Sequence, residues 1–317
     1  MTKPQHLLIT GASSGIGRMA AQRLEQNGHR LTLICRNRER AEAALSWVAP
    51  TTTVLLADLA DLAAVDQICR YLLEEGGLID GMVLNAGLQY AGHRQPRWSA
   101  QGFELTIAVN HLAHQLLLIR LLPLLLESAH PRLVITASEV HNPSSGGGRV
   151  GRPAGLGDLD GLKGATSGAM LDGQSRFDAD KAYKDSKLCN LLMGLETSRR
   201  HPDLPVICWS PGLVIPRDSG GFFRSSREAN PIGQALFGFV ARDLLRITES
   251  VERAGEHLQQ LVLDPAGPGF RYWSNTLVGP GRHRFEPESP SPEATDAVKA
   301  EHLWALSQER IMAALSV

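Results

Sequence analysis

The stretch Thr10-Gly11-Ala12-Ser13-Ser14-Gly15-Ile16-Gly17 decides the fold of this chain. It follows the apolar run His6–Thr10, which predicts a strand, and it leads into a helical pattern over Gly17–Asn27. Glycines at the spacing G-x-x-x-G-x-G allow a turn with positive φ and leave the first helical amide groups open to a pyrophosphate. A turn of this kind between a first strand and a first helix predicts a dinucleotide site, with contacts from Gly11, Ser13, Ser14, Gly15, Ile16 and Gly17.

Strand-like runs and helical patterns alternate over the first two thirds of the chain. Most of the runs are continuously apolar, as in strands whose two faces are both covered by helices. The alternation predicts right-handed crossovers and a parallel sheet. We therefore expect an α/β fold, a Rossmann-type doubly wound parallel sheet with helices on both faces in a single domain. Further strands are expected at Leu31–Cys35, Thr53–Ala57, Gly81–Asn85, Arg132–Ser138 and Val206–Ser210.

The composition excludes several classes of protein. The 317 residues carry 32 Lys plus Arg against 33 Asp plus Glu, a formal net charge of −1 at pH 7. This balance provides no overall positive field for nucleic acid. Hydrophobic residues make up 43% of the chain, which is typical of a folded protein. The four cysteines are widely spaced without a CxxC pair, and the histidines lack ligand spacing. We therefore expect no disulfides, no metal site and a location in the reducing cytoplasm.

The most apolar segment is Leu112–Leu126. Arg120 and Pro123 interrupt it, and it is shorter than the ~20 residues that a membrane span needs. We expect no integral membrane span and interpret the segment as a buried helix. It could also pack against another subunit, so a monomer and a homo-oligomer both stay open.

The end of the second expected strand, Ile34-Cys35-Arg36-Asn37-Arg38, indicates which dinucleotide binds. A site for NAD usually offers Asp or Glu here to the ribose 2′-hydroxyl. This chain offers Arg36 instead, and a guanidinium group suits a 2′-phosphate. We therefore expect NADP(H) as the cofactor, with further help from Arg18 or Arg38. The alternative is that Arg36 is a solvated loop residue.

Two more strand ends are expected at the cofactor. Asp58 ends the third strand, where it could accept a hydrogen bond from the adenine amino group, with Leu59 beside it. The small turn Asn85-Ala86-Gly87 ends the fourth strand and would let the backbone line the cofactor. Either could instead be an ordinary turn at a strand end.

Tyr183 and Lys187 form a candidate acid–base pair. They are four residues apart in a helical pattern, so they share one helix face. A tyrosine with its usual pKa of ~10 is a poor acid or base at neutral pH, and a nearby ammonium group would lower that pKa. The pair could then exchange a proton with a carbonyl or an alcohol. Such pairs also occur on solvated helix faces, so the interpretation depends on the dinucleotide turn.

Ser138 and Asn110 are expected at the same site. Ser138 ends the fifth strand, at the carboxyl edge where α/β proteins bind ligands, and its hydroxyl can donate to a substrate oxygen. Asn110 lies in an apolar helical pattern, where asparagine is unfavourable. It could bend the helix and hold a water molecule that connects Lys187 to bulk solvent, or it could be a purely structural buried asparagine.

Together these motifs resemble the short-chain dehydrogenase/reductase family over most of the chain. The resemblance is carried by TGASSGIG (10–17), LNAG (84–87), VNH (109–111), Ser138, YKDSK (183–187) and SPG (210–212). It implies a catalytic tetrad of Asn110, Ser138, Tyr183 and Lys187. It also implies that the last two contact the cofactor and that its nicotinamide end is held by Pro211, Gly212 and Val214. The family often has a threonine after this turn, where this chain reads Leu213-Val214-Ile215-Pro216.

A closer similarity is to light-dependent protochlorophyllide reductases. It is carried by the long insertion between Ser138 and Tyr183 and by AYKDSKLCN (182–190), GDLDGL (157–162), SGAMLDG (167–173) and QGFEL (101–105). Retinol dehydrogenase-like reductases are the next nearest group, sharing CRN (35–37) and NHLAH (110–114). The pigment reductases carry a cysteine where this chain has Leu213, and they read Cys-Asn-Ala-Ala where it has LNAG. The resemblance therefore implies a paralogue with the same scaffold and another bulky apolar substrate.

We expect an NADPH-dependent oxidoreductase that transfers hydride to a carbonyl or an activated C=C bond of a bulky apolar or pigment-like substrate. Three alternatives stay open: a true light-dependent protochlorophyllide reductase, a retinol or carbonyl dehydrogenase, and a non-catalytic NADP(H)-binding sensor. The sensor would need the glycine turn but not the tetrad.

The chain is expected to form one elaborated domain over residues 1–286. It would carry an insertion at about 143–180 and, by the family resemblance, a substrate lid at about 216–246. Four aromatic side chains could line this lid: Phe222, Phe223, Phe237 and Phe239. Residues 287–317 would form an exposed linker and a helix over Ala294–Leu315, capped by Ser291 or Thr295 and packed on the same domain.

Overall fold

The computed structural model describes residues 4–164, 168–216 and 224–316. Eight strands in these residues form one sheet in the order β3-β2-β1-β4-β5-β6-β7-β8. All neighbours are parallel except β7 and β8. The predicted doubly wound sheet is confirmed, because the order reverses between β1 and β4. The strands are β1 (His6–Thr10), β2 (Arg30–Cys35), β3 (Thr53–Leu56), β4 (Gly81–Leu84), β5 (Arg132–Thr136), β6 (Pro205–Ser210), β7 (Gly269–Gly279) and β8 (Arg282–Pro287).

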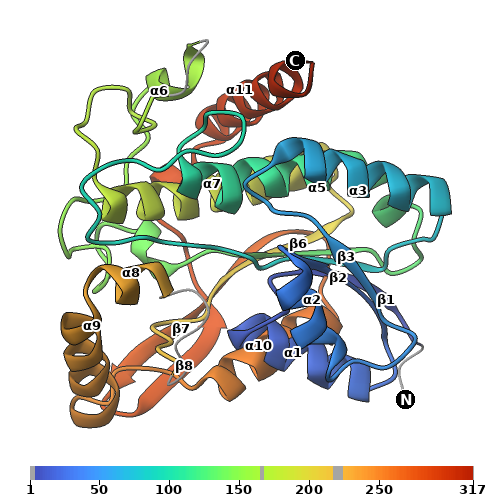
Figure 1. Cartoon of the computed structure of the whole chain (residues 1–317), viewed down its shortest axis with the longest axis horizontal. Coiled ribbons are helices and arrows are strands. Elements are labelled where there is room, and N and C mark those ends of the chain that lie inside the picture. The colour runs from blue at the N-terminus through green and yellow to red at the C-terminus, as the bar shows by residue number, and fades with distance from the viewer. Residues whose placement is uncertain (1–3, 165–167, 217–223, 317) are drawn as a thin grey trace.

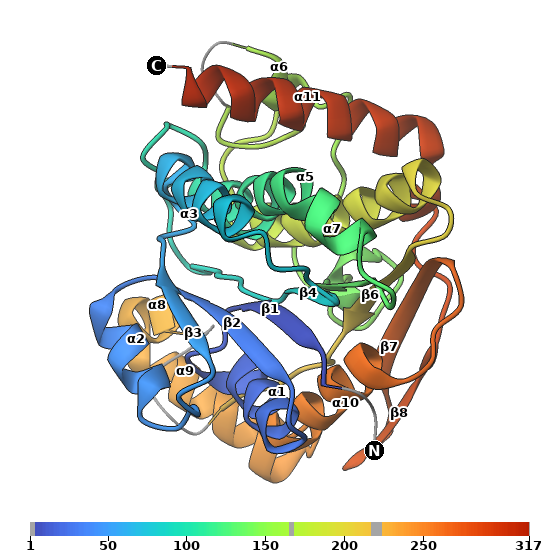
Figure 2. The ribbon, with the colours of Figure 1, turned by 90° about the vertical axis from the view of Figure 1, so that its right-hand side faces the viewer.

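Helices cover both faces of the sheet (Figures 1 and 2). One face carries α3 (Leu62–Glu75), α5 (Ala113–Leu126) and α7 (Ala179–Arg200), with α11 (Ala297–Leu315) packed against them as an outer layer. The other face carries α1 (Gly15–Gln26), α2 (Arg38–Leu45) and α10 (Val251–Leu263). Short elements fill the connections: α4 (Leu105–Ile107), η1 (Ala108–Leu112), η2 (Glu139–His141), α6 (Asp160–Lys163), α8 (Arg224–Ala229), α9 (Pro231–Gly238), η3 (Phe239–Leu244) and η4 (Glu293–Thr295).

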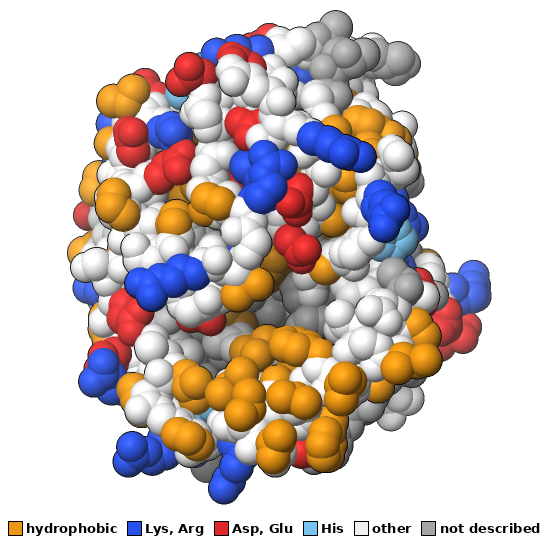
Figure 3. Space-filling view, turned by 90° about the vertical axis from the view of Figure 1, so that its left-hand side faces the viewer, with side chains coloured by type: hydrophobic (Ala, Val, Ile, Leu, Met, Phe, Trp, Pro, Cys, Tyr) orange, Lys and Arg blue, Asp and Glu red, His pale blue; other side chains and the backbone are white. Residues whose placement is uncertain are grey.

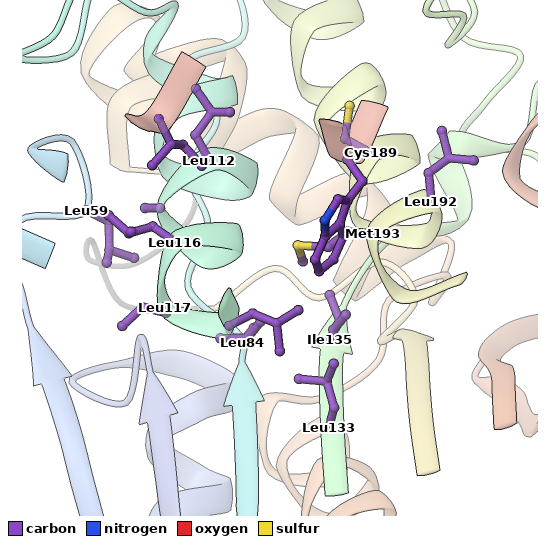
Figure 4. Packing of buried hydrophobic residues seen from close by; sticks show 14 of the residues in the cluster. Leu59, Leu84, Leu112, Leu116, Leu117, Leu133, Ile135, Cys189, Leu192 and Met193 are labelled. Carbon is purple, nitrogen blue, oxygen red and sulfur yellow. The ribbon is translucent and has the colours of Figure 1, made fainter. Parts of the chain in front are cut away.

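Each face of the sheet has its own apolar core. In the larger core, strand residues such as Leu84 and Ile135 meet Leu116 of α5 and Met193 of α7 (Figure 4). The smaller core packs strand residues against Leu24 of α1 and Leu258 of α10. Burial of both strand faces is why the strands read as continuous apolar runs.

The apolar segment at Leu112–Leu126 is a core helix, as expected. The helical stretch Leu105–Leu126 is long and apolar enough to cross a membrane, but 72% of an apolar 18-residue segment of it is buried inside the protein. That burial is typical of a core helix. The four cysteines are buried free thiols.

The sequence patterns missed β7 and β8. β8 reads Arg282-His-Arg-Phe-Glu-Pro and lies at the sheet edge, so its charged side chains face water and the strand carries little apolar signal. β7 is apolar only in part, because it extends beyond the rest of the sheet to pair with β8.

The C-terminal segment also differs from expectation in detail. The last helix begins at Ala297, because the Asp296 carboxylate accepts hydrogen bonds from the amides of Val298 and Lys299 at 3.0 Å. Neither Ser291 nor Thr295 caps it. Ser291 is buried instead, where its amide donates to Nε2 of His141 at 3.1 Å, so the expected exposed linker is anchored.

Candidate active site

A large cavity opens at the carboxyl ends of the central strands. Its volume is about 1230 Å³, and it lies where the strand order reverses, the usual ligand position in such sheets. The space-filling view shows it as a hollow in the surface (Figure 3). Every predicted site residue except Asn110 lines it: Gly11, Ser13, Ser14, Gly15, Ile16, Gly17, Arg36, Asp58, Leu59, Asn85, Ala86, Gly87, Ser138, Tyr183, Lys187, Pro211, Gly212 and Val214.

The glycine turn packs directly against the turn that follows β4. Gly11 has φ +72°, and a Cβ there would lie 2.8 Å from Cα of Ala86. A Cβ on Gly17 would lie 2.4 Å from the carbonyl oxygen of Gly11. Thr10 locks the two turns together, because its Oγ1 accepts hydrogen bonds from the amides of Asn85 and Ala86, both at 2.9 Å. The glycines are therefore needed for close approach as well as for positive φ.

The N-terminus of α1 is open toward the cavity. Ser14 is the N-cap but its side chain does not cap the helix, and the first turn holds no acidic residue. The first amide groups of α1 and its dipole are therefore available to an anion. With the glycine turn that lets the backbone approach, this end of the cavity fits the pyrophosphate of a dinucleotide.

Two arginines line the cavity beyond the end of β2. Arg36 is exposed at its rim, as expected. Arg40 also lines it, because the side chain of Asn37 caps α2 through the amide of Arg40 at 3.0 Å and so sets Arg40 on the first helical turn. Sequence reasoning missed Arg40, although the Asn cap three residues earlier could have placed it. Neither proposed helper belongs to the lining. Arg18 lies over the Trp47 ring, 5.8 Å from its centroid, and Arg38 is exposed.

Asp58 and Asn85 are both held by hydrogen bonds at the cavity wall. Oδ1 of Asp58 accepts from the amide of Ala60 at 2.9 Å. Nδ2 of Asn85 donates to the carbonyl of Thr10 at 3.1 Å, and its Oδ1 accepts from Oγ1 of Thr136 at 3.2 Å. These bonds fix the two strand ends, so both residues stabilise turns as well as lining the cavity.

Ser138, Tyr183 and Lys187 meet on one wall of the cavity. Tyr183 makes a side-chain hydrogen bond with Ser138. Nζ of Lys187 lies 5.7 Å from the centre of the Tyr183 ring and donates to the carbonyl of Thr136 at 3.0 Å. Burial lowers the pKa of Lys187 to about 8.

The pKa of Tyr183 is shifted in the direction opposite to the sequence expectation. Burial raises it, and the hydrogen bond with Ser138 opposes that effect. We expected Lys187 to lower the pKa of Tyr183, but Lys187 is not among the causes of the shift. The phenol is therefore protonated at neutral pH and is set up to donate rather than accept a proton.

Asn110 lies behind the cavity wall in the π-helical turn η1. Its Oδ1 accepts from the amide of Leu88 at 2.8 Å, and its Nδ2 donates to the carbonyl of Leu88 and to Oγ of Ser186, both at 3.0 Å. These bonds connect the segment after Gly87 to α7. Both the segment and the helix contribute residues to the cavity lining. This connection accounts for an asparagine in an apolar helical segment. The water-holding role that the sequence suggested stays a prediction.

His114 is a further residue of this framework, and sequence reasoning treated it only as core. Its Nδ1 contacts the carbonyl of Asn110 and its Nε2 contacts Oγ1 of Thr10, both at 3.0 Å. Burial lowers the pKa of His114 to about 3, so the ring is neutral. It therefore joins the glycine turn of β1 to the turn that carries Asn110. The i, i+4 spacing of Asn110 and His114 was the available signal.

Comparison with known proteins identifies the family. A family profile described as short chain dehydrogenase matches residues 5–148. Protochlorophyllide reductase A of Oryza sativa subsp. japonica, a chloroplast protein, is 36% identical over 319 residues, which cover 96% of this chain and 80% of the rice protein. Protochlorophyllide reductase of Cucumis sativus is 35% identical over 318 residues, covering 96% and 77%. This chain belongs to the short-chain dehydrogenase family.

Solved structures share the fold of this chain. An uncharacterised protein from Mycobacterium paratuberculosis superimposes with a TM-score of 0.66 at 25% identity, covering 97% of this dehydrogenase and 93% of that chain. A protein described as a short-chain dehydrogenase from Shigella flexneri, in complex with NADP, has a TM-score of 0.58 at 22% identity, with coverages of 84% and 95%. The second likeness shows the fold alone. The family is one of oxidoreductases, and a nicotinamide cofactor fits the glycine turn described above.

Two buried lysines of α7 hold the insertion of this dehydrogenase through hydrogen bonds. Nζ of Lys184 donates to the carbonyls of Gly148, Val150 and Arg152. One turn earlier, Nζ of Lys181 donates to the Asp185 carboxylate at 2.6 Å and to the carbonyl of Gly155 at 2.7 Å. The inserted segment forms part of the cavity wall, so these bonds position it over the site. Apart from α6, the described part of the insertion is irregular, as expected.

Replacing Lys184 with methionine is expected to lower kcat/KM for the substrate by about tenfold or more, because the wall beside Tyr183 would lose its three anchors. The affinity for the cofactor should change little, since the hydrogen bonds of Lys184 hold the insertion and not the glycine turn. Steady-state kinetics and a cofactor titration measure the two effects. Lys163→Met, at a half-exposed lysine in the same insertion, is the matched control. Equal kinetics for the two variants would contradict the positioning role.

The region expected to form a lid is described only in part. Residues 224–244 form α8, α9 and η3, whereas Phe222 and Phe223 lie outside the described residues. Phe237 lines the cavity, but Phe239 is exposed and does not. Leu213, which follows the Pro211-Gly212 turn, also lines the cavity.

Proposed function

We propose that this protein reduces a carbonyl group or an activated C=C bond of a bulky apolar substrate, with NADPH as the cofactor. The observation that carries the proposal is the pairing of Tyr183 with Ser138 on the wall of the same cavity whose other end is the glycine turn. Bound NADPH would supply the hydride. The protein's own side chains then have to hold the acceptor oxygen and deliver a proton.

In this proposal Ser138 donates a hydrogen bond to the substrate oxygen and Tyr183 donates the proton. Burial keeps the phenol protonated until it is needed. Lys187 carries its charge below about pH 8, and that charge stabilises the phenolate left after transfer. Asn110 and His114 act through the backbone: they hold the segments that place Lys187 and the glycine turn.

Arg36 and Arg40 support the choice of NADP(H) over NAD(H). Replacing both with alanine is expected to weaken NADPH binding by about 10- to 100-fold, because each substitution removes a charged hydrogen bond to the 2′-phosphate. Binding of NADH should change by less than about threefold, since it lacks that phosphate. Fluorescence titrations with both nucleotides measure the difference. Arg38→Ala, an exposed neighbour outside the cavity lining, serves as the control. Equal losses for the two nucleotides would overturn the assignment.

The substrate class is supported by the apolar part of the cavity. Beyond the glycine turn the lining includes Leu88, Val140, Leu213, Phe237, Ile247 and Leu277. A large apolar cavity with a few converging polar groups is typical of a site for a bulky apolar ligand. We also propose a cytoplasmic location. The four cysteines are buried free thiols, which suits a reducing compartment such as the cytoplasm.

Protochlorophyllide is a second candidate substrate, favoured by the 36% identity to a protochlorophyllide reductase. The experiment is to follow NADPH consumption with a panel of bulky ketones and enals in the dark, and the pigment absorption band with NADPH in light. Turnover in the dark supports the proposal. A band shift in light assigns the pigment instead. Binding of NADPH with no turnover in either arm would indicate the non-catalytic sensor.

A further inference from the structure

An apolar face lies on the α9 side of the molecule, outside the cavity. α9 has no charged residue and buries only Gly238, so Ile232 is 83% exposed and Leu236 62% exposed. The neighbouring η3 and the β7–β8 turn add more exposed apolar side chains. Figure 3 shows apolar side chains gathered at the border of the hollow. We define the apolar face as Ile232, Leu236, Phe239, Leu244, Leu245 and Val278.

Closure over a substrate does not account for this face. None of its six side chains lines the cavity; the cavity's edge in this region is formed by Phe237 and Leu277. Covering the cavity therefore does not by itself require these six side chains to be apolar. Contiguous exposed apolar groups of this kind mark contact with a membrane or with another protein.

The charges around the face favour an anionic partner. Residues 225–246 and 277–286 contain five arginines and three carboxylates, an excess of two positive charges in a chain whose net charge is −1. Two of these arginines are paired, Arg242 with Asp243 and Arg284 with Glu286. The amide of Gly281 donates to the carbonyl of Arg246 at 2.6 Å, which ties the β7–β8 turn and Arg282 to the end of η3. A twofold dimer through this face would bring the arginines of one copy against those of the other. A surface of anionic headgroups would instead neutralise them.

We propose that the apolar face docks this protein on an anionic lipid surface. Its leucine and phenylalanine side chains would enter the headgroup region while the arginines around them contact lipid phosphates. Because Phe237 and Leu277 continue the face into the cavity, an apolar substrate dissolved in lipid would reach Tyr183 with little exposure to water. Only this delivery step rests on the proposed function.

The test is cosedimentation of the full chain with phosphatidylcholine vesicles that contain or lack phosphatidylglycerol, at low and high salt. We expect binding only to the anionic vesicles, and weaker binding at high salt because the ions screen the arginines. The double variant Phe239→Asp/Leu244→Asp is expected to reduce the partition at least about tenfold. The matched control is Val298→Asp/Met312→Asp, which places two acids at exposed apolar positions of α11 on the opposite end of the molecule (Figure 1).

Three results would overturn the proposal: no partition of the unmodified chain, equal partition of the two variants, or a dimer in light scattering that the Phe239→Asp/Leu244→Asp variant dissociates without any vesicle binding. A titration with NADPH shows whether each variant is folded, since the substitutions lie outside the cavity lining. Vesicle binding is read without turnover, so failure of the proposed reaction and failure of the docking surface are separate outcomes.

Discussion

Replacing Tyr183 with phenylalanine is expected to lower kcat for NADPH-dependent reduction by about 10³-fold or more. The change removes the hydroxyl that bonds Ser138 and that would give its proton to the substrate oxygen, and general acid catalysis by one side chain is typically worth ~10²–10⁴-fold. The ring itself stays, so Lys187 keeps the aromatic face beside it. The affinity for NADPH should stay within about twofold.

Two measurements test this prediction: single-turnover hydride transfer and a fluorescence titration with NADPH. Tyr71→Phe removes a hydroxyl from an exposed tyrosine on α3 and should leave both unchanged. If Tyr183→Phe kept full activity, another group would have to supply the proton, and the proposed role would be wrong. If Tyr183→Phe lost both activity and NADPH binding, the main role of Tyr183 would be structural.

Replacing Gly17 with valine is expected to abolish nucleotide binding within the measurable range, a loss of at least about 100-fold. A Cβ at this position would lie 2.4 Å from the Gly11 carbonyl oxygen and 2.5 Å from Nδ2 of Asn85, so both turns would have to move apart. Asn85 would then lose its bond to the Thr10 carbonyl. Overpacking of this kind costs ~1–3 kcal/mol of stability in addition to the distorted site.

Calorimetry and an NADPH titration separate the two effects of Gly17→Val. Gly77→Ala is the control, because its Cβ would meet nothing closer than an Arg30 side chain at 3.5 Å. A Gly17→Val variant that binds NADPH normally would show that the close packing of the two turns is not what shapes the nucleotide site.

The local sequence was sufficient to predict the strands that are buried on both faces. β1, β2, β4, β5 and β6 are buried on both faces, so each appears as an unbroken apolar run. The edge strand β8 is charged because one side of it meets water, and no local pattern separates it from a loop. The cap of α11 was misplaced for a similar reason: several capping residues stand in a row, and only packing selects Asp296.

By itself the sequence determined the doubly wound sheet, the family and the residues that line the cavity, because strand ends and a glycine turn carry their position in their spacing. Only the tertiary structure decided what those residues do to one another. It showed that burial raises the pKa of Tyr183, that Asn110 and His114 brace the site from behind, and that Arg40 joins Arg36. Desolvation and contacts between segments distant in sequence depend on how the elements pack, and no local pattern contains that information.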